Sequence, residues 1–370
     1  MRLLVLCSSL GVGGAQRQLV TLVPRLAERG FEPMVRTLRP RRQGHYFFEN
    51  LVEAGISTES VDMRSRWDLG GAVRGYRLWR LRPDVVFSQS IDAQVIGHLI
   101  ALRLGVPHIT AHHSGPGILE GVHRKLMTRM LAPHFDRVIA VSGVQIPELE
   151  ELGFRHEGVR LIPNGVGMPV VRRSRETVRR ELGVGADDFV AILAATLRPE
   201  KQVRVFLEAV ARAHAHDPRI RGLLAGAGPG LADAQARAAA GGNVVQVLGR
   251  RADIPDLLSA SDCLSLSSDS EALPLSVIEA MSLGKPVVST GVGGISDAVV
   301  DGQSGILVPP RDPQALADAL VALAADPSRA EAMGRAGYQR FEEKFRLERM
   351  VDAYADAITS AVRGHTRRRR

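Results

Sequence analysis

Two glutamates on either side of a predicted helix start are the strongest chemical signal in this 370-residue sequence. Glu271 and Glu279 are separated by seven residues. Between them, Pro274 suits the first position of a helix that Gly284 and Pro286 would end. Carboxylates beside a helix start can accept hydrogen bonds from hydroxyl-rich groups, while the free backbone amides hold phosphate. A solvated pair of glutamates is the alternative interpretation of the same composition.

A second candidate site is the glycine-rich turn at residues 10–17, which follows an apolar, strand-like segment. Gly11, Gly13 and Gly14 would let backbone amides approach an anion at the positive end of a helix. Their spacing differs from the dinucleotide fingerprint Gly-x-Gly-x-x-Gly, and no acidic partner follows at the end of the next strand. A turn with a purely structural role is the alternative.

The elements that would position these residues follow a repeated strand–helix pattern. Short segments rich in Val, Ile and Leu alternate with stretches of helical spacing. Continuous apolar strands of this kind predict parallel sheets that are covered by helices on both faces. The predicted strands are, in chain order, 2–8, 33–38, 56–61, 85–88, 108–111, 137–141, 159–162, 189–195, 219–225, 244–248, 263–266, 286–290 and 305–308.

The pattern breaks at residues 163–169, where two prolines enclose two glycines. We interpret this segment as the hinge between an N-terminal domain, 1–166, and a C-terminal domain, 167–345. Residues 346–370 would form a helix that packs back on the first domain, followed by a basic tail, because apolar residues recur with helical spacing over 347–362. The predicted fold class is α/β, with two Rossmann-like, doubly wound domains and a cleft between them.

Several motifs together resemble glycosyltransferase family 4, the retaining GT-B enzymes also called glycosyl transferases group 1. The segment from Glu271 to Met281 resembles the Glu-x7-Glu signature of this family. Other segments resemble, in the family's order, its N-terminal Gly-Gly loop, its hinge, its phosphate-binding turn and its later glycine motifs: 13–16, 163–166, 197–201, 225–229, 249–254 and 293–297. The resemblance covers nearly the whole chain and implies an acceptor-binding first domain and a nucleotide-sugar-binding second domain.

The resemblance also implies roles for individual residues. Lys201 and Arg198 would neutralise the donor diphosphate, whose negative charge grows as the sugar leaves. Glu279 would bind the ribose hydroxyls, and Glu271 would bind hydroxyls of the transferred sugar. The implied catalytic residues are His113, which would face the donor sugar across the cleft, Glu271, Arg198 and Lys201. The implied donor-binding residues are Gly13, Gly14, Arg198, Lys201, Gly228, Arg250, Glu271, Leu275, Ser276 and Glu279.

Three positions depart from the family pattern. Thr196 occupies a position where the family often has an arginine, five residues before the phosphate-binding lysine. The residues 272–274 replace Gly-Phe-Gly by Ala-Leu-Pro, which removes backbone freedom beside the donor sugar. Ala227 stands where aspartate is frequent in the family. These departures put the rate of the reaction in question rather than its class.

Composition narrows the class of protein. Charged residues are 24% and apolar residues 45%, which is typical of globular domains. Cys7 and Cys263 lie in apolar segments, so we expect neither a disulfide nor a metal site. The apolar start stops at Cys7, too early for a signal peptide or a spanning helix. We therefore expect a cytoplasmic protein, peripheral on the inner face of the plasma membrane if the basic segments bind lipid.

Positive charge is concentrated in the first half of the chain, where residues 1–168 contain 21 Lys and Arg against 15 Asp and Glu. Residues 74–82 and 124–131 mix cations with apolar side chains, and residues 367–370 are all arginine. Such segments can lie on an anionic membrane. Alternatively, their apolar residues pack into the core and the tail is only solubilising. Nucleic acid is not an expected partner, because no aromatic residues interleave with the cations.

The resemblance predicts an enzyme, a hexosyltransferase that moves a sugar from a UDP- or GDP-type donor to a glycan or lipid-linked acceptor. Cell-envelope polysaccharide or glycolipid synthesis is the expected setting. We expect no cofactor and no divalent metal, since no Asp-x-Asp occurs in the sequence. The alternatives are a nucleotide-sugar epimerase or a glycan phosphorylase of the same fold, and a non-catalytic binding module attached to a membrane.

Overall fold

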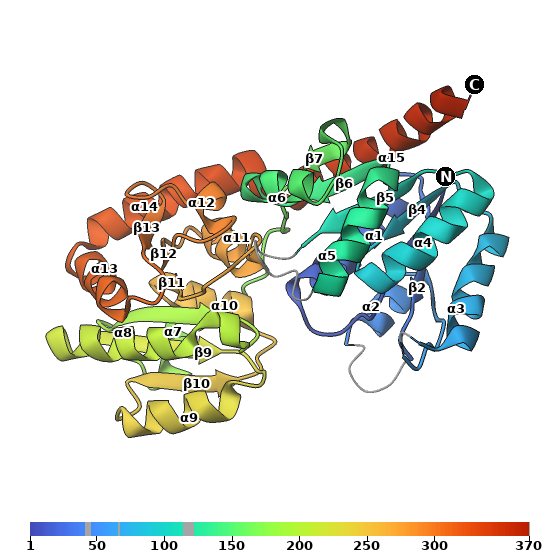
Figure 1. The fold of residues 1–370 in the computed structure, drawn as a ribbon. Helices are drawn as coiled ribbons and strands as arrows, with labels where there is room; N and C mark the ends of the chain where they lie inside the picture. The colour runs from blue at the N-terminus through green and yellow to red at the C-terminus, as the bar shows by residue number, and fades with distance from the viewer. Residues whose placement is uncertain (41–45, 66, 114–121, 370) are drawn as a thin grey trace. The chain divides into compact units, whose positions relative to one another are not determined.

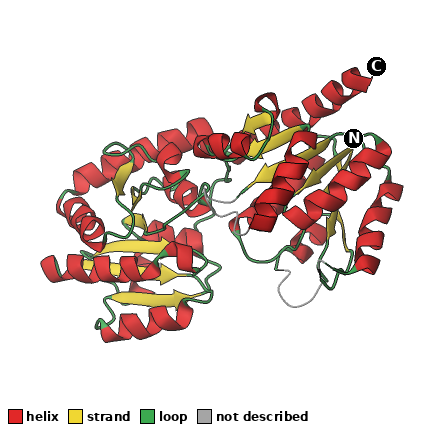
Figure 2. Cartoon of the chain, in the orientation of Figure 1, coloured by secondary structure: helices red, strands yellow, loops and turns green. Residues whose placement is uncertain are grey.

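The computed structural model describes residues 1–40, 46–65, 67–113 and 122–369 (Figure 1). The chain divides into two compact units. The first unit contains Met1–Asn164 and Glu348–Arg370, and the second contains Gly165–Leu347. Both units combine a sheet with surrounding helices (Figure 2).

The first unit is built on a seven-stranded parallel sheet with the strand order β3-β2-β1-β4-β5-β6-β7. These strands are β1 (Arg2–Cys7), β2 (Glu32–Thr37), β3 (Ser57–Ser60), β4 (Val85–Ser88), β5 (His108–His112), β6 (Arg137–Ala140) and β7 (Val159–Leu161). The helices of this unit are α1 (Gly14–Ala27), α2 (Phe48–Glu53), α3 (Leu69–Tyr76), α4 (Ile91–Leu104), α5 (Val122–Leu131), α6 (Ile146–Glu151) and the terminal helix α15 (Leu347–Arg369).

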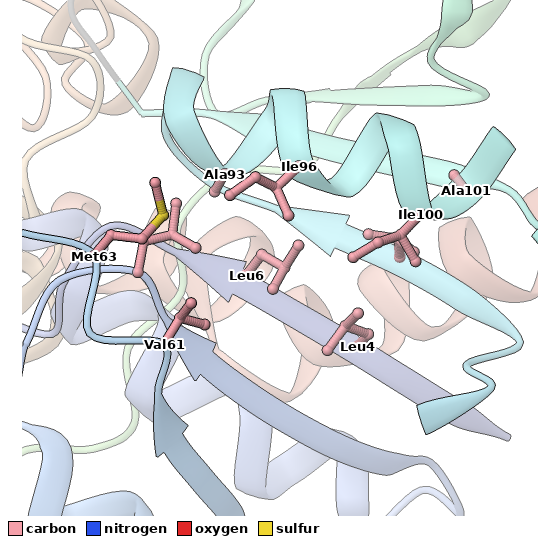
Figure 3. Close-up of a cluster of buried hydrophobic side chains, with 10 residues drawn as sticks. Leu4, Leu6, Val61, Met63, Ala93, Ile96, Ile100 and Ala101 are labelled. Atoms are coloured by element: carbon pink, nitrogen blue, oxygen red, sulfur yellow. The ribbon is translucent and has the colours of Figure 1, made fainter. Parts of the chain in front are cut away.

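A core of aliphatic side chains joins α4 to this sheet. Ile96 and Ile100 point from α4 toward Leu4 and Leu6 on β1 (Figure 3). All four side chains are at most 5% exposed. Burial on both faces explains why these strands are continuous apolar segments rather than alternating ones.

The terminal helix α15 packs on the first unit, on the side of α1. Arg29 forms an ion pair with Asp352 at 2.6 Å, and Gln18 donates a hydrogen bond to the sulfur of Met350. Tyr354, which is 1% exposed, places its ring 6.1 Å from that of Phe87 on β4. The predicted return of the last helix to the first domain is therefore confirmed.

The second unit is built on a six-stranded parallel sheet with the strand order β10-β9-β8-β11-β12-β13. Its strands are β8 (Phe189–Ala194), β9 (Ile220–Ala225), β10 (Val245–Gly249), β11 (Cys263–Leu266), β12 (Val287–Thr290) and β13 (Gly305–Val308). Its helices are α7 (Arg175–Glu181), α8 (Val203–His216), α9 (Leu231–Ala240), α10 (Ile254–Ala260), α11 (Leu275–Ser282), α12 (Ile295–Ala298), α13 (Pro313–Ala325) and α14 (Pro327–Arg340).

The predicted elements agree closely with the structure. Every predicted strand is present, and each of its ends lies within one residue of the prediction. Two details were wrong. Pro274 is the capping residue before α11 rather than its first helical residue, because its extended backbone, with ψ of 131°, does not continue the helix. The last helix continues to Arg369 rather than ending at 362, because Gly364 lies inside the regular helical backbone and does not end it.

Candidate active site

Two loops meet at the carboxyl edge of the second sheet. Strands β8 and β11 are neighbours, so the loops that follow them begin side by side. Lys201, on the first loop, forms an ion pair with Glu271, on the second, at 2.5 Å. The same carboxylate oxygen accepts a hydrogen bond from the Ser268 hydroxyl at 2.7 Å. The Lys201 side chain is 18% exposed and that of Glu271 is 8% exposed, so the pair lies largely out of water.

Further hydrogen bonds fix these two loops to each other. The Ser267 hydroxyl donates to the carbonyls of Lys201 and Gln202, both at 3.0 Å. The Asp269 amide donates to the Glu200 carbonyl at 2.8 Å, and the Gln202 side chain donates to Asp269 at 2.7 Å. Lys201 and Glu271 are 70 residues apart in the sequence. Hydrogen bonds between their loops hold them together in addition to the attraction between their charges.

A glycine from a third loop packs directly behind Glu271. Gly293 has a φ of +54°, and a Cβ added there would lie 1.8 Å from the Glu271 carbonyl oxygen. The amide of the next residue, Gly294, donates to that carbonyl at 3.3 Å. Only glycine allows this close approach, so the position of Glu271 depends on Gly293.

Helix α11 begins directly after this loop. The backbone amides of Leu275 and Ser276 lie in its first turn, which contains no acidic residue. Free amides at a helix start carry a partial positive charge and favour an anion. Glu279, one turn further along, is 7% exposed, as is Glu271. Both glutamates of the signature are therefore buried, and the solvated pair that composition alone allowed is not what the structure contains.

The other predicted donor-binding residues of the second unit lie on neighbouring loops. Arg198 is exposed, and its side chain has no ion pair with any described residue. Gly228 approaches the backbone of Leu197 so closely that a Cβ there would lie 2.7 Å from its carbonyl oxygen. Arg250 is exposed and follows β10, which β9 separates from β8.

In the first unit, Gly13 and Gly14 stand at the start of α1, whose first turn contains no acidic residue. Among the described residues, a Cβ added at Gly14 would meet nothing within 4 Å, and one at Gly13 would lie 2.4 Å from the side-chain oxygen of Gln16. Contacts with the described residues therefore do not explain the glycine at position 14, whereas the Gln16 side chain limits what fits at position 13.

His113 follows β5 at the carboxyl edge of the first sheet. Its Nε2 lies 3.0 Å from the side-chain nitrogen of Gln89, which directly follows the neighbouring strand β4. An amide nitrogen only donates, so His113 Nε2 accepts and the imidazole is neutral. Burial and the neighbouring His112 lower the pKa of His113 to about 4, which agrees with a neutral ring. His113 and Glu271 belong to different units, so their approach across a cleft stays a prediction.

Sequence reasoning missed two residues of these sites, Ser268 and Gln89. Each is a polar residue that is buried where an apolar strand ends, and this position is a signal that a search could use. Among the residues that the structure describes, no three His, Cys, Asp or Glu side chains are grouped so as to hold a metal ion.

Two family models match this chain, one after the other along its length. Residues 12–167 match "Glycosyltransferase Family 4", and residues 174–340 match "Glycosyl transferases group 1". A D-inositol 3-phosphate glycosyltransferase from Streptomyces bingchenggensis is 30% identical over 312 residues, which are 77% of this chain and 68% of that protein. One from Geodermatophilus obscurus is 33% identical over 304 residues, 75% and 67% of the two chains.

The chain belongs to glycosyltransferase family 4.

Solved glycosyltransferase structures share the fold of this chain. HepE from Anabaena, in complex with UDP and glucose, superposes with a TM-score of 0.85 at 23% identity, over 97% of this chain and 100% of that one. Sucrose-phosphate synthase from Thermosynechococcus elongatus gives 0.80 at 20% identity, over 97% and 99%. The predicted GT-B fold is therefore confirmed. As a family 4 glycosyltransferase, this protein is an enzyme that uses a nucleotide-sugar donor.

Proposed function

We propose that this family 4 enzyme is a retaining glycosyltransferase that moves a hexose from a UDP- or GDP-type donor to a glycan or lipid-linked acceptor. Cell-envelope polysaccharide or glycolipid synthesis is the setting that we propose for it. The observation that carries the proposal is the Lys201–Glu271–Ser268 group, which lies beside the start of α11. One cation, a set of free amides and buried carboxylates suit a diphosphate joined to a sugar.

In this proposal, the bond between the sugar's anomeric carbon and the diphosphate oxygen breaks while the acceptor oxygen bonds to the same carbon from the same face. The acceptor hydroxyl gives its proton to the departing phosphate. Negative charge on that phosphate increases during the step. Lys201 and Arg198 stabilise it more strongly in the transition state than in the bound donor, and this difference accelerates the reaction.

The relatives support a UDP-sugar as the first donor to test. HepE was solved with UDP-glucose, and TarM of S. aureus, which has a TM-score of 0.78 at 12% identity, was solved with UDP. The D-inositol 3-phosphate glycosyltransferases support a hydroxyl-rich acceptor.

The test is a panel of UDP- and GDP-hexoses, scored by the rise in melting temperature of the purified protein and by slow release of nucleotide. We expect one donor to stabilise the wild type and to be hydrolysed, with or without EDTA. Lys201→Met should lose both responses, whereas Glu208→Gln, an exposed change on α8, should keep them. No response from any donor would contradict the proposal. Conversion of a donor to a second nucleotide sugar without acceptor would instead identify an epimerase.

A further inference from the structure

Two helices on one face of the first sheet expose large apolar side chains. Helix α4 exposes Leu99 and Leu102, which are 47% and 62% exposed. Helix α5 packs beside α4 and exposes Leu126, Met127 and Met130, which are 55%, 40% and 66% exposed. We call these five side chains the α4–α5 face, in which Leu99 and Leu102 line a hollow with Tyr76 and Arg103. Large apolar patches on a protein surface mark sites where a partner binds.

Helix α5 presents Leu126, Met127 and Met130 outward, whereas Thr128 and Leu131 lie on its inner side. Thr128 is 6% exposed, whereas Leu126 and Met130, on the two sides of it in sequence, are turned to the solvent. An ordinary surface helix buries its apolar stripe against the core. The exposure of three large apolar side chains on the outer side of α5 is explained if something outside the protein covers that side.

Helix α4 is apolar on both sides. Its inner side packs on the sheet through Ile96 and Ile100 (Figure 3), and its outer side carries Leu99 and Leu102. These two leucines share the exposed part of α4 with polar residues such as Arg103, and two large exposed leucines on one helix suit contact with a partner. The outer side of α4 therefore points to the same conclusion as α5, independently of it.

Several exposed cations lie on α4 and α5 or on the segment 77–81 that packs beside α4. Arg80, Arg103, Lys125 and Arg129 are on or beside these helices, and none has an ion pair with a described residue. The Arg103 guanidinium lies 4.2 Å from the centre of the Trp79 ring. Residues 122–135 contain no Asp or Glu. The apolar face thus has a cationic border.

The structure distinguishes the two basic segments that the sequence analysis singled out. In residues 74–82, Leu78, Trp79 and Leu81 pack against the core. These apolar side chains are therefore part of the core and do not form a surface that binds a membrane. In residues 124–131, Leu126, Met127 and Met130 face the solvent instead, and only Leu131 packs against the core. The side chain of Arg124 and those of Arg368, Arg369 and Arg370 lie outside the described residues.

We infer that the α4–α5 face binds the surface of an anionic lipid bilayer, with Leu102 and Met130 in the acyl boundary and the bordering cations on the headgroups. Burial of the apolar side chains and attraction of the cations to anionic headgroups would act together. A second copy of the chain fits less well, because a symmetric contact would bring the two cationic borders together. No helix among the described residues is long and apolar enough to cross a bilayer, so binding would be shallow. The inference does not depend on the proposed donor or acceptor.

Sedimentation with lipid vesicles tests this inference on the full chain. Vesicles of phosphatidylcholine and phosphatidylglycerol should bind the wild type, vesicles of phosphatidylcholine alone should not, and high salt should release it. The double variant Leu102→Glu/Met130→Glu should bind about tenfold more weakly or worse. Val52→Glu is the matched control, because Val52 is 46% exposed on α2, which packs beside α1, and its binding should equal that of the wild type.

Two outcomes would overturn the inference. One is equal binding of the wild type and the double variant to anionic vesicles, or no binding of the wild type to either vesicle. The other is a concentration-dependent dimer that the double variant abolishes, in the absence of vesicle binding, which would assign the face to a second copy. An unchanged melting temperature shows that each variant is folded. If a nucleotide sugar raises the melting temperature of a protein that does not bind vesicles, the membrane inference fails while the proposed function stands.

Discussion

At the scale of single residues, one carboxylate oxygen of Glu271 accepts from both Lys201 and Ser268. Glu271 thereby neutralises the lysine in the free protein and fixes its position. A pyrophosphate that binds here competes with Glu271 for the ammonium group, so the pair serves both stability and the proposed donor binding. These two roles can be separated by substitution, since one depends on balanced charge and the other on the cation itself.

We predict that Lys201→Met lowers the free energy of unfolding by about 3 kcal/mol, because the buried Glu271 loses its counter-charge. The double variant Lys201→Met/Glu271→Gln should recover most of this loss, since the neutral amide can still accept from Ser268. Its affinity for the nucleotide sugar should stay at least about tenfold below that of the wild type. Urea unfolding and donor titration measure the two effects. Recovery of donor affinity in the double variant would contradict a role for the cation.

At the scale of loops and helices, the candidate site depends on close backbone contacts between segments that follow different strands. Gly293 follows β12, and Glu271 follows β11. The two loops touch because the Gly293 backbone occupies the left-handed region and has no side chain. The position of Glu271 therefore depends on a contact with the loop that contains Gly293.

We predict that Gly293→Ala displaces the Glu271 loop and weakens donor binding at least about tenfold, since its Cβ would overlap the Glu271 carbonyl. Gly302→Ala is the control, because Gly302 has a similar φ of +73° but nothing within 4 Å of the added Cβ. The control should lose about 1 kcal/mol from backbone strain alone and keep its donor affinity. Equal donor affinity in the two variants would show that the contact does not matter.

The terminal helix α15 supplies core residues to a unit that the chain left about two hundred positions earlier. We predict that Tyr354→Ala lowers the free energy of unfolding by about 3 to 5 kcal/mol, because its side chain is 1% exposed. Tyr338→Ala, on α14 and 39% exposed, should change it by about 0.5 kcal/mol. Urea denaturation of both variants checks this. A small effect at Tyr354 would mean that α15 is dispensable to the fold of the first unit.

At the scale of the whole molecule, buried histidines make stability depend on pH. His108 is 1% exposed, and its Nε2 lies 2.8 Å from the Ser88 hydroxyl. Burial first, and then the neighbouring His98, lowers the pKa of His108 to about 3. Because the folded pKa lies below the unfolded value of about 6.5, the unfolded chain takes up the proton first as pH falls. Stability from this group is complete above about pH 6.5 and is lost below it.

We predict that the free energy of unfolding falls between pH 6.5 and pH 4, with His108 contributing about 1.4 kcal/mol per pH unit. His108→Asn should make this slope shallower by about that amount. Urea unfolding at several pH values measures both slopes. A slope that is the same in the variant would show that His108 does not carry the dependence.

The sequence by itself determined which segments form strands and helices and where along the chain each of them lies. Apolar runs, helical spacing and stop residues are local signals, so strand ends were predicted to within one residue. Its motifs also identified the family and the two glutamates. The two errors concern single helix ends. The last helix does not end at 362, and Pro274 precedes α11 instead of being its first helical residue.

Only the tertiary structure decided which distant residues meet and which side chains face outward. The contact between Lys201 and Glu271 depends on β8 and β11 being neighbours, and that between Gly293 and Glu271 on a backbone approach of two loops. Likewise, the outward side of α5 follows from the way the helix is rotated on the sheet, with Thr128 inside. Sequence periodicity reports a repeat along one element, whereas pairing and rotation are set by packing between elements.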